Sequence, residues 1–252
     1  MSKPALPLEG YKHLRRDTPP SASLLHRPTA SMPSGAVGDV IDWLGRSIAG
    51  EHFPIGSTLP MEIELGDMVG VSRTVIREAV KIVSSKGVLR TARRYGTVVC
   101  PMDDWNLLDA EVIRWFAPSD SATRMIFSEL VELMAIVLPQ AVSASAGSLP
   151  AVPGPVTTLA LQTLQDHQSA VADRVRAEYS LWAQILDAPK AAIYAQFRGL
   201  VFEMVRLTYA FEDRHPGTDA IFGELMQQVS QRQMQEADLN CRLLLKRSRS
   251  LI

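Results

Sequence analysis

The chain has 252 residues, of which 46% are hydrophobic and 21% are charged, and its formal net charge is −1. This length exceeds the usual size of one domain and predicts two, with enough apolar residues to bury a sizeable core. The two cysteines, Cys100 and Cys241, have neither metal-finger spacing nor a disulfide framework, which indicates a reducing, cytoplasmic location. The sequence contains no run of eighteen apolar residues and no secretory signal, so we expect no membrane association.

Residues 1–34 are expected to form a flexible tail, because six of the sixteen prolines lie there among serines and threonines. For the basic residues of this tail, we favour a solvated leader over a DNA contact. A helix is predicted over 36–48, where apolar residues recur at helical spacing and would complete a three-helix core with the two helices that follow. These apolar residues are Val37, Val40, Ile41, Leu44 and Ile48.

Two short helices joined by a tight turn are predicted next. The first, over 61–68, is expected to bury Ile63, Leu65 and Met68 and to end before Gly70, which would form the turn. The second begins after Ser72, whose hydroxyl can accept from the free amides of the first turn. Its apolar stripe consists of Ile76, Ala79, Val80 and Val83, and its exposed face carries Arg73, Thr74, Arg77 and Lys81.

A two-stranded hairpin, or wing, is predicted after this helix, with strands near 88–91 and 97–99 and with Gly96 at the tip. Seven lysines and arginines lie between Arg73 and Arg94, against one acid, Glu78. Such a basic patch suits DNA phosphates, and arginine can also read guanine in the major groove. The alternative is an ordinary solvated helix face. We favour a winged helix-turn-helix that binds duplex DNA, because the cap, the turn and the wing occur in the order that this fold requires.

The segment from 50 to 99 resembles the DNA-binding domain of the GntR family of bacterial transcription regulators. The resemblance rests on the motifs Gly56-Ser57-x-Leu59-Pro60-x-Glu62, Val71-Ser72-Arg73-Thr74, Arg77-Glu78-Ala79 and Tyr95-Gly96-Thr97. It implies operator contacts from the second helix and the wing tip. We expect the DNA-binding residues to be Arg73, Thr74, Arg77, Lys81, Arg93, Arg94, Tyr95 and Gly96. One departure is Ile63, which stands where many members have an arginine and removes a polar contact expected from the first helix.

From residue 105 to the C-terminus the pattern is helical throughout and predicts an antiparallel bundle. Helices are expected near 105–117, 120–146, 156–173, 175–187, 190–212, 218–233 and 234–249, separated by proline and glycine breaks. The predicted fold class is therefore mainly α, with a winged helix-turn-helix over 35–103 and an all-α domain over 104–252. This second domain resembles the FadR-type subfamily, and its sugar-acid regulators in particular, through the motifs Trp105-Asn106-x-Leu108-Asp109-x-x-Val112-x-x-Trp115, Glu129-Leu130-x-x-Leu133 and Pro139-x-Ala141.

Many domains of that subfamily hold a divalent metal with one aspartate and three histidines inside the bundle, and the metal binds a carboxylate effector. The resemblance places these ligands on Glu178, Trp182, Phe222 and Leu244, so only one acid is kept. A single carboxylate cannot hold a transition metal that needs several imidazoles, and we expect neither a metal nor a cofactor. Either the apolar replacements close the bundle, or a metal-free pocket binds an effector. The candidates for such a pocket are Glu178, Trp182, Arg198, Arg206 and Phe222, with Gln184 and Tyr194 beside them.

Together these features favour a transcription regulator, and a repressor in particular, that binds a palindromic operator in double-stranded DNA as a homodimer. The resemblance implies that the helical domain dimerises and responds to a small carboxylate, for which a sugar acid is favoured. A regulator of the same fold without an effector, or one that responds to an acyl thioester, is the alternative. An enzyme or metabolite-binding protein with an accessory DNA module is disfavoured, because no catalytic constellation is visible in the sequence.

Overall fold

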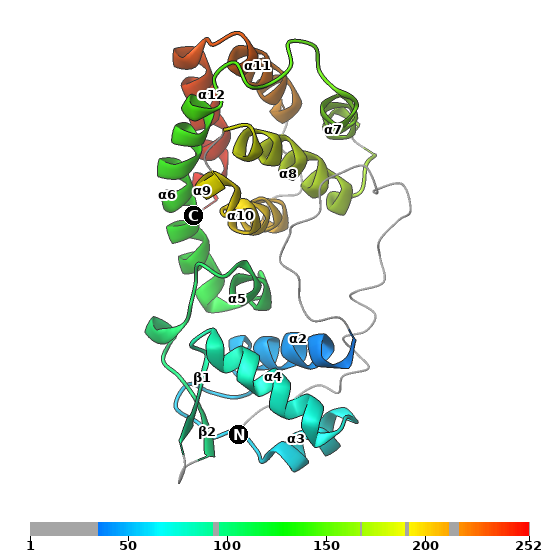
Figure 1. The fold of residues 1–252 in the computed structure, drawn as a ribbon, viewed down its shortest axis with the longest axis vertical. Helices are drawn as coiled ribbons and strands as arrows, with labels where there is room; N and C mark the ends of the chain where they lie inside the picture. The colour runs from blue at the N-terminus through cyan, green and yellow to red at the C-terminus, as the bar shows by residue number, and fades with distance from the viewer. Residues whose placement is uncertain (1–34, 93–95, 167, 190–191, 212–216, 252) are drawn as a thin grey trace. The chain divides into compact units, whose positions relative to one another are not determined.

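The computed structural model describes residues 35–92, 96–166, 168–189, 192–211 and 217–251. These residues form two compact units, the first ending at Asp120 and the second beginning at Ser121 (Figure 1). The tail expected over 1–34 and the wing residues Arg93, Arg94 and Tyr95 lie outside the described residues.

The first unit has a three-helix core with a hairpin beside it and ends in a short helix. Its elements are α2 (Ala36–Ala49), α3 (Glu62–Val69), α4 (Arg73–Ser85), β1 (Leu89–Ala92), β2 (Gly96–Val99), the 3-10 turn η3 (Met102–Asp104) and α5 (Ala110–Trp115). Helix α4 packs against α2, α3 and β1. The helix-turn-helix and the wing predicted from the sequence are therefore confirmed.

Helix α4 forms where the sequence predicts it. The Ser72 hydroxyl accepts a hydrogen bond from the Val75 amide at 3.5 Å, and Gly70 takes a left-handed conformation (φ 72°) in the turn before it. The predicted apolar stripe is buried, with exposures of 7% or less for Ile76, Ala79, Val80 and Val83. The opposite face of the helix is consequently the one that meets solvent.

The buried face of α3 differs from the predicted one. Ile63 and Met68 are 58% and 43% exposed, and the helix buries Leu65, Gly66 and Val69 instead. Positions 63 and 65 lie about 200° apart around an α-helix, so both cannot face the same core. The expectation that Ile63 and Met68 are buried was therefore wrong.

The wing has a third, strand-like neighbour that the sequence did not reveal. β1 and β2 pair antiparallel in the register Leu89–Val99, Arg90–Val98, Thr91–Thr97 and Ala92–Gly96. Residues 56–59 run along the other edge of β2. The Gly56 amide donates to the Val99 carbonyl at 2.9 Å, and the Leu59 amide donates to the Thr97 carbonyl at 2.8 Å. The segment between α2 and α3 thus fixes the base of the wing.

Helix α5 belongs to the first unit, which extends past residue 103, the domain boundary expected from the sequence. The helix expected over 105–117 begins only at Ala110, because Asp109 caps it by accepting from the Glu111 amide at 2.9 Å. Its Trp115 is fully buried against α2, where a Cβ added at Gly45 would lie 2.1 Å from the indole. This close contact requires glycine at position 45.

The second unit is an all-α antiparallel bundle, as predicted. Its helices are α6 (Ser121–Ala144), α7 (Pro155–Gln165), α8 (Val171–Asp187), α9 (Ala192–Ala195), α10 (Arg198–Phe211), α11 (Thr218–Ser230) and α12 (Met234–Arg249). Helix α12 packs on α6 and α11, while α8 packs on α7 and α10 (Figure 1). The helix expected over 156–173 stops at Gln165, and the one expected over 190–212 is divided into α9 and α10.

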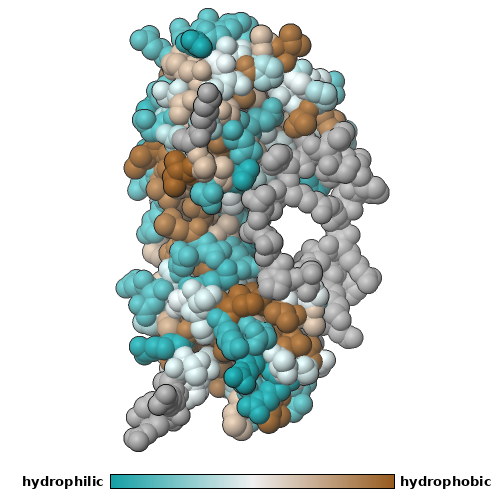
Figure 2. Space-filling view, viewed as in Figure 1, coloured by the Kyte–Doolittle hydropathy of each residue, from teal (hydrophilic) through white to brown (hydrophobic). Residues whose placement is uncertain are grey.

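Helix α6 is long and apolar enough to cross a membrane by length and composition, and it is the single such helix within the described ranges. Half of its most apolar stretch is buried in the bundle, as in the core helices of globular domains. Hydrophobic residues also reach the surface along this helix (Figure 2), where Met125 and Ile136 are 52% and 70% exposed. Its start lies beside the end of α12, since the Arg124 side chain donates to the Leu251 carbonyl at 3.0 Å.

Candidate DNA interface and bundle interior

The outer face of α4 gathers polar and basic side chains (Figure 2). Those predicted to bind DNA are all exposed: Arg73, Thr74, Arg77 and Lys81. The Arg73 Nε donates to Glu62 Oε2 at 2.8 Å, and the Lys81 ammonium donates to Glu78 Oε1 at 2.8 Å. Arg77 makes no ion pair among the residues that the structure describes. Its guanidinium is therefore available to an external ligand.

A groove of about 330 Å³ runs beside the start of α4, between α3 and the wing. The ion pair of Glu62 with Arg73 lies at its wall, and exposed Ile63 adds an apolar side chain. The sequence prediction missed Glu62 as the partner of Arg73. The signal for it is the Pro60-x-Glu62 motif, which places an acid at the first position of α3.

The described part of the wing explains its glycine. Gly96 has φ +77°, and a Cβ there would lie 3.1 Å from the Thr58 methyl group. Both the left-handed backbone and the neighbouring segment therefore favour glycine. Arg93, Arg94 and Tyr95, the other wing residues predicted to bind DNA, lie outside the described residues.

Lys86, one of the seven basic residues counted toward the DNA-binding patch, is not part of that exposed face. Its side chain is 14% exposed and pairs with Asp109 and Glu111 at 2.5 and 2.6 Å. The spacing of basic residues alone could not distinguish a buried lysine from an exposed one. The surface patch is smaller than the sequence suggested.

Three helices of the second unit bring polar side chains together in the bundle interior. Glu178 of α8 is 1% exposed, and its Oε1 accepts from Arg247 Nη2 of α12 at 2.5 Å. Arg247 Nη1 also donates to the Thr218 hydroxyl, at the start of α11, at 2.7 Å. The guanidinium thus connects α8, α11 and α12 through one acid and one hydroxyl. We call Glu178, Thr218 and Arg247 the interior polar layer.

The interior polar layer contains buried atoms without hydrogen-bond partners among the described residues. These atoms are Glu178 Oε2, Arg247 Nε and the neighbouring indole Trp182 Nε1. Tyr209 of α10 also interacts with Glu178, and burial together with the negative charge of Glu178 raises the pKa of its hydroxyl. Because buried polar atoms in proteins are nearly always paired, two unpaired atoms in this layer and one on the adjacent indole are unusual.

An apolar layer lies one helical turn away. Trp182 follows Glu178 by four residues, Phe222 follows Thr218 by four, and Leu244 precedes Arg247 by three. All three apolar side chains are at most 3% exposed, and the Trp182 and Phe222 rings meet edge to face with centroids 5.0 Å apart. The structure thus brings Trp182 and Phe222, two of the residues proposed for an effector pocket, into contact one turn from Glu178. It adds Arg247, which was not predicted from the sequence.

A metal site of the kind known in the subfamily does not fit these residues. Within the described ranges, no group of three or more His, Cys, Asp or Glu side chains lies together. The one acid at the expected position, Glu178, is bound by a guanidinium. The donor set therefore lacks the imidazoles that a transition metal needs.

The two arginines predicted for an effector pocket are engaged elsewhere. Arg198 donates to Asp187 Oδ1 at 2.8 Å, and Arg206 donates to Glu203 Oε2 at 2.5 Å. Neither contact involves the interior polar layer. Gln184, proposed to lie beside the pocket, accepts a hydrogen bond from the Thr157 hydroxyl at 2.8 Å.

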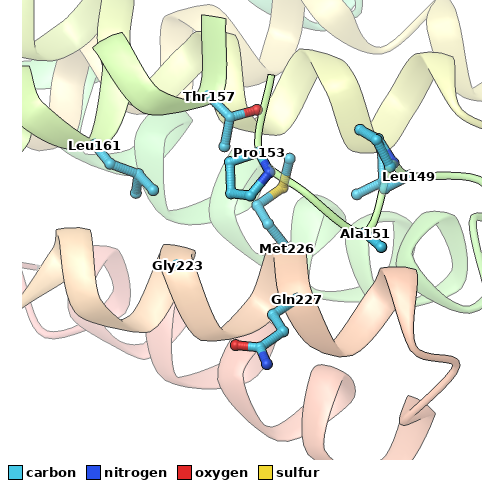
Figure 3. Close-up of a pocket in the computed structure, with 9 residues that line it drawn as sticks. Leu149, Ala151, Pro153, Thr157, Leu161, Gly223, Met226 and Gln227 are labelled. Atoms are coloured by element: carbon cyan, nitrogen blue, oxygen red, sulfur yellow. The ribbon is translucent and has the colours of Figure 1, made fainter. Parts of the chain in front are cut away.

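A hollow of the second unit lies between the 149–153 segment, α7 and α11 (Figure 3). Its volume is about 130 Å³, and most of its lining is apolar. Thr157 and Gln227 supply its polar side chains. Gly223 of α11, which has no side chain, leaves space at its wall. The sequence prediction did not identify this hollow, because its walls come from three separate segments.

Comparisons with known proteins agree with the geometry of the first unit. Residues 37–99 match the family described as bacterial regulatory proteins, gntR family. The uncharacterized HTH-type transcriptional regulator YieP of Escherichia coli K12 is 44% identical over 86 residues, which are 34% of this chain and 37% of YieP. The galactonate operon transcriptional repressor of the same organism is 33% identical over 100 residues, which are 40% of this chain and 43% of that protein. The chain thus matches about two-fifths of the length of these relatives.

Two longer but weaker similarities cover both units. The fatty acid metabolism regulator protein of Haemophilus influenzae is 22% identical over 204 residues, 79% of this chain and 82% of that protein. The solved structure of Lar, which controls expression of the Listeria monocytogenes agr system, aligns with a TM-score of 0.59 at 12% identity. That alignment covers 86% of this chain and 96% of Lar, and it shows a shared fold.

Proposed function

From the match of residues 37–99 to the gntR family of bacterial regulatory proteins, we propose that the whole chain is a transcription regulator that binds operator DNA. The observation that carries the proposal is the exposed basic face of α4, with Arg77 unpaired among the described residues and Arg73 close to the wing groove. The relatives that match the first unit and the weaker relative that matches both units are all named as regulators, which disfavours an enzyme.

The test is the substitution Arg77→Ala. An operator is first selected from a random duplex library, and its affinity is then measured by fluorescence anisotropy. We expect a loss of about 1–3 kcal/mol, or roughly 5- to 150-fold, because one arginine fork on a base pair contributes this much. Arg242→Ala is the matched control, since Arg242 is an exposed arginine of α12 paired with Asp238. Equal affinity for the folded Arg77→Ala protein and the wild type contradicts this docking.

We further propose that the chain acts as a repressor and as a homodimer on a palindromic operator in the cytoplasm. One recognition helix reads only a few base pairs, whereas a two-fold dimer reads two half-sites. Support comes from the galactonate operon repressor, which shares the DNA-binding domain. Light scattering at micromolar concentration tests the dimer, and a reporter behind the selected operator tests repression. A monomer contradicts the proposed dimer. A reporter output that is lower without the protein than with it contradicts repression.

For the effector we propose a small carboxylate, with sugar acids as the first class, that binds at Arg247. A buried carboxylate needs a cation or several donors, and Arg247 supplies a guanidinium in the bundle interior whose Nε has no partner among the described residues. An entering carboxylate would accept from this Nε, while Glu178 keeps its hydrogen bond from Arg247 Nη2. The role assigned from the sequence to Arg198 and Arg206 thereby passes to Arg247, because Arg247 pairs with Glu178 in the interior polar layer, whereas those two pair with Asp187 and Glu203 outside it.

The effector proposal is tested by thermal shift with sugar acids, other small carboxylates and acyl thioesters. A ligand that raises the melting temperature should release the operator from the wild type and lose its effect in Arg247→Met. Arg249→Met is the control, since Arg249 is an exposed arginine on the same helix. If no ligand of the panel binds, the regulator without an effector is the better description. If acyl thioesters alone bind, the sugar-acid class is wrong.

A further inference from the structure

The C-terminal end of the recognition helix α4 is fastened to the segment that follows the wing. The Asn106 amide donates to the Lys86 carbonyl at 2.8 Å. Next to it, Gly87 has φ +79°, and a Cβ there would lie 1.9 Å from the Asp104 carbonyl oxygen. The main chain of residues 104–106 therefore packs directly on the residue that ends α4.

The side chain of Lys86 makes a second connection to the same segment. Its ammonium, 14% exposed, lies 2.5 Å from Asp109 Oδ2 and 2.6 Å from Glu111 Oε2. The other oxygen of Asp109 accepts from the Glu111 amide at 2.9 Å and so caps α5. One carboxylate thus holds the end of α4 and the start of α5 together.

The charges explain why the Lys86 ammonium stays with Asp109 and Glu111. Burial lowers the pKa of Lys86, but the hydrogen bonds to Asp109 and Glu111 outweigh it and raise the pKa above its ordinary value. The ammonium therefore stays charged at neutral pH. Moving it to a phosphate would leave two acids behind, one of them, Glu111, only 5% exposed. Lys86 is consequently unsuited to DNA contact, although it lies at the end of a basic helix.

We propose that Lys86 and Asp109 are positioning residues for DNA binding, which fix the direction of α4 by tying it to the segment 104–109. The inference rests on the proposed operator binding. It also gives the Trp105–Asp109 motif a physical role within the first unit. The Trp105 indole donates to the Cys100 carbonyl at 3.0 Å, Asn106 holds the Lys86 carbonyl, and Asp109 holds the Lys86 ammonium.

The decisive variant is Asp109→Asn, because positioning and simple electrostatics predict opposite results. Loss of a negative charge from a DNA-binding domain should strengthen phosphate attraction or leave it unchanged. Loss of positioning should weaken binding to the selected operator by on the order of tenfold, with binding to unrelated duplex kept. Asparagine also caps helices well, so α5 keeps its start. Equal or tighter operator binding by Asp109→Asn overturns the proposal.

Lys86→Met gives the second test, through the dependence of affinity on salt. A phosphate contact removed from the protein reduces the slope of log K against log salt by about one. We expect an unchanged slope for Lys86→Met with weaker operator binding at every salt concentration. Lys81→Met is the matched control for a lost DNA contact, because Lys81 is an exposed lysine of the same helix that is predicted to bind DNA. A reduced slope for Lys86→Met would show that Lys86 contacts phosphate and would refute positioning.

The outcomes separate this inference from the function on which it rests. If the wild type binds no duplex in the selection, the proposed function fails. If the wild type binds and Asp109→Asn binds equally well at a temperature where both are folded, the function stands and positioning fails. A ratio of specific to nonspecific affinity that falls in both variants supports positioning, since a loss of stability alone does not change this ratio in a folded protein.

Discussion

The buried ion pair of Glu178 with Arg247 yields a prediction for the stability of the second unit. Removing one partner leaves a charge in the bundle interior, which typically costs about 3–5 kcal/mol. Glu178 is 1% exposed and the Arg247 side chain is 16% exposed. We therefore expect Arg247→Met, which strands the buried carboxylate, to lose about 3–5 kcal/mol. Glu178→Gln should lose less, because the stranded guanidinium keeps the Thr218 hydroxyl and some water.

The double variant Glu178→Leu/Arg247→Met sharpens this prediction. Replacing a whole buried pair by apolar residues is often neutral or stabilising, so the double variant should recover most of the lost free energy of unfolding. Hydrogen exchange of the α8 peptides measures the opening of this unit separately from the first. Arg242→Met, which removes an exposed pair with Asp238, is the control and should change the free energy by less than about 1 kcal/mol. If Arg247→Met also changes the free energy of unfolding by less than about 1 kcal/mol, Glu178 and Arg247 do not act as a buried charge pair.

Three further properties are expected. Burial raises the pKa of the Cys100 thiol and raises that of Cys241 to about 12, so both thiols stay protonated at pH 8. They should react with a disulfide reagent only after unfolding, and rapid modification of the native protein would contradict this. Gly45→Ala should destabilise the first unit by about 1–3 kcal/mol or more in thermal melts, because its Cβ meets the Trp115 indole, whereas Gly154→Ala, with open space around it, should not. Elemental analysis of protein purified without a metal-affinity tag should give well below one equivalent of zinc, nickel or manganese, and a stoichiometric metal would mean that the metal site has been misplaced.

The local order of the first unit was predictable because it depends on neighbouring residues. The stripe from Ile76 to Val83, the cap at Ser72 and the turn at Gly70 each follow from the spacing along one helix and its ends. The pairing of residues 56–59 with β2 was not predictable in this way, since its hydrogen bonds join segments about forty residues apart. The same holds for Lys86, whose acids lie more than twenty residues further on.

In the second unit, the sequence pointed to apolar side chains in the bundle and missed the cation. The subfamily resemblance singled out Trp182 and Phe222, and both are buried. Arg247 lies 69 residues from Glu178, in a basic C-terminal stretch that has the composition of a solvated helix end. Only the antiparallel packing of α12 in the bundle turns this arginine inward. A buried ion pair between distant helices has no signature in the local sequence.

The strand-like segment beside β2 also determines how the wing behaves toward other chains. Within the described residues, β2 has a neighbour on each side, so its amide and carbonyl groups are not available to a foreign strand. One outer edge of this small sheet is β1, where Arg90 and Thr91 are exposed. Charged and polar residues on an edge strand discourage edge-to-edge pairing. The described sides of the wing therefore resist the strand exchange through which exposed hairpins aggregate.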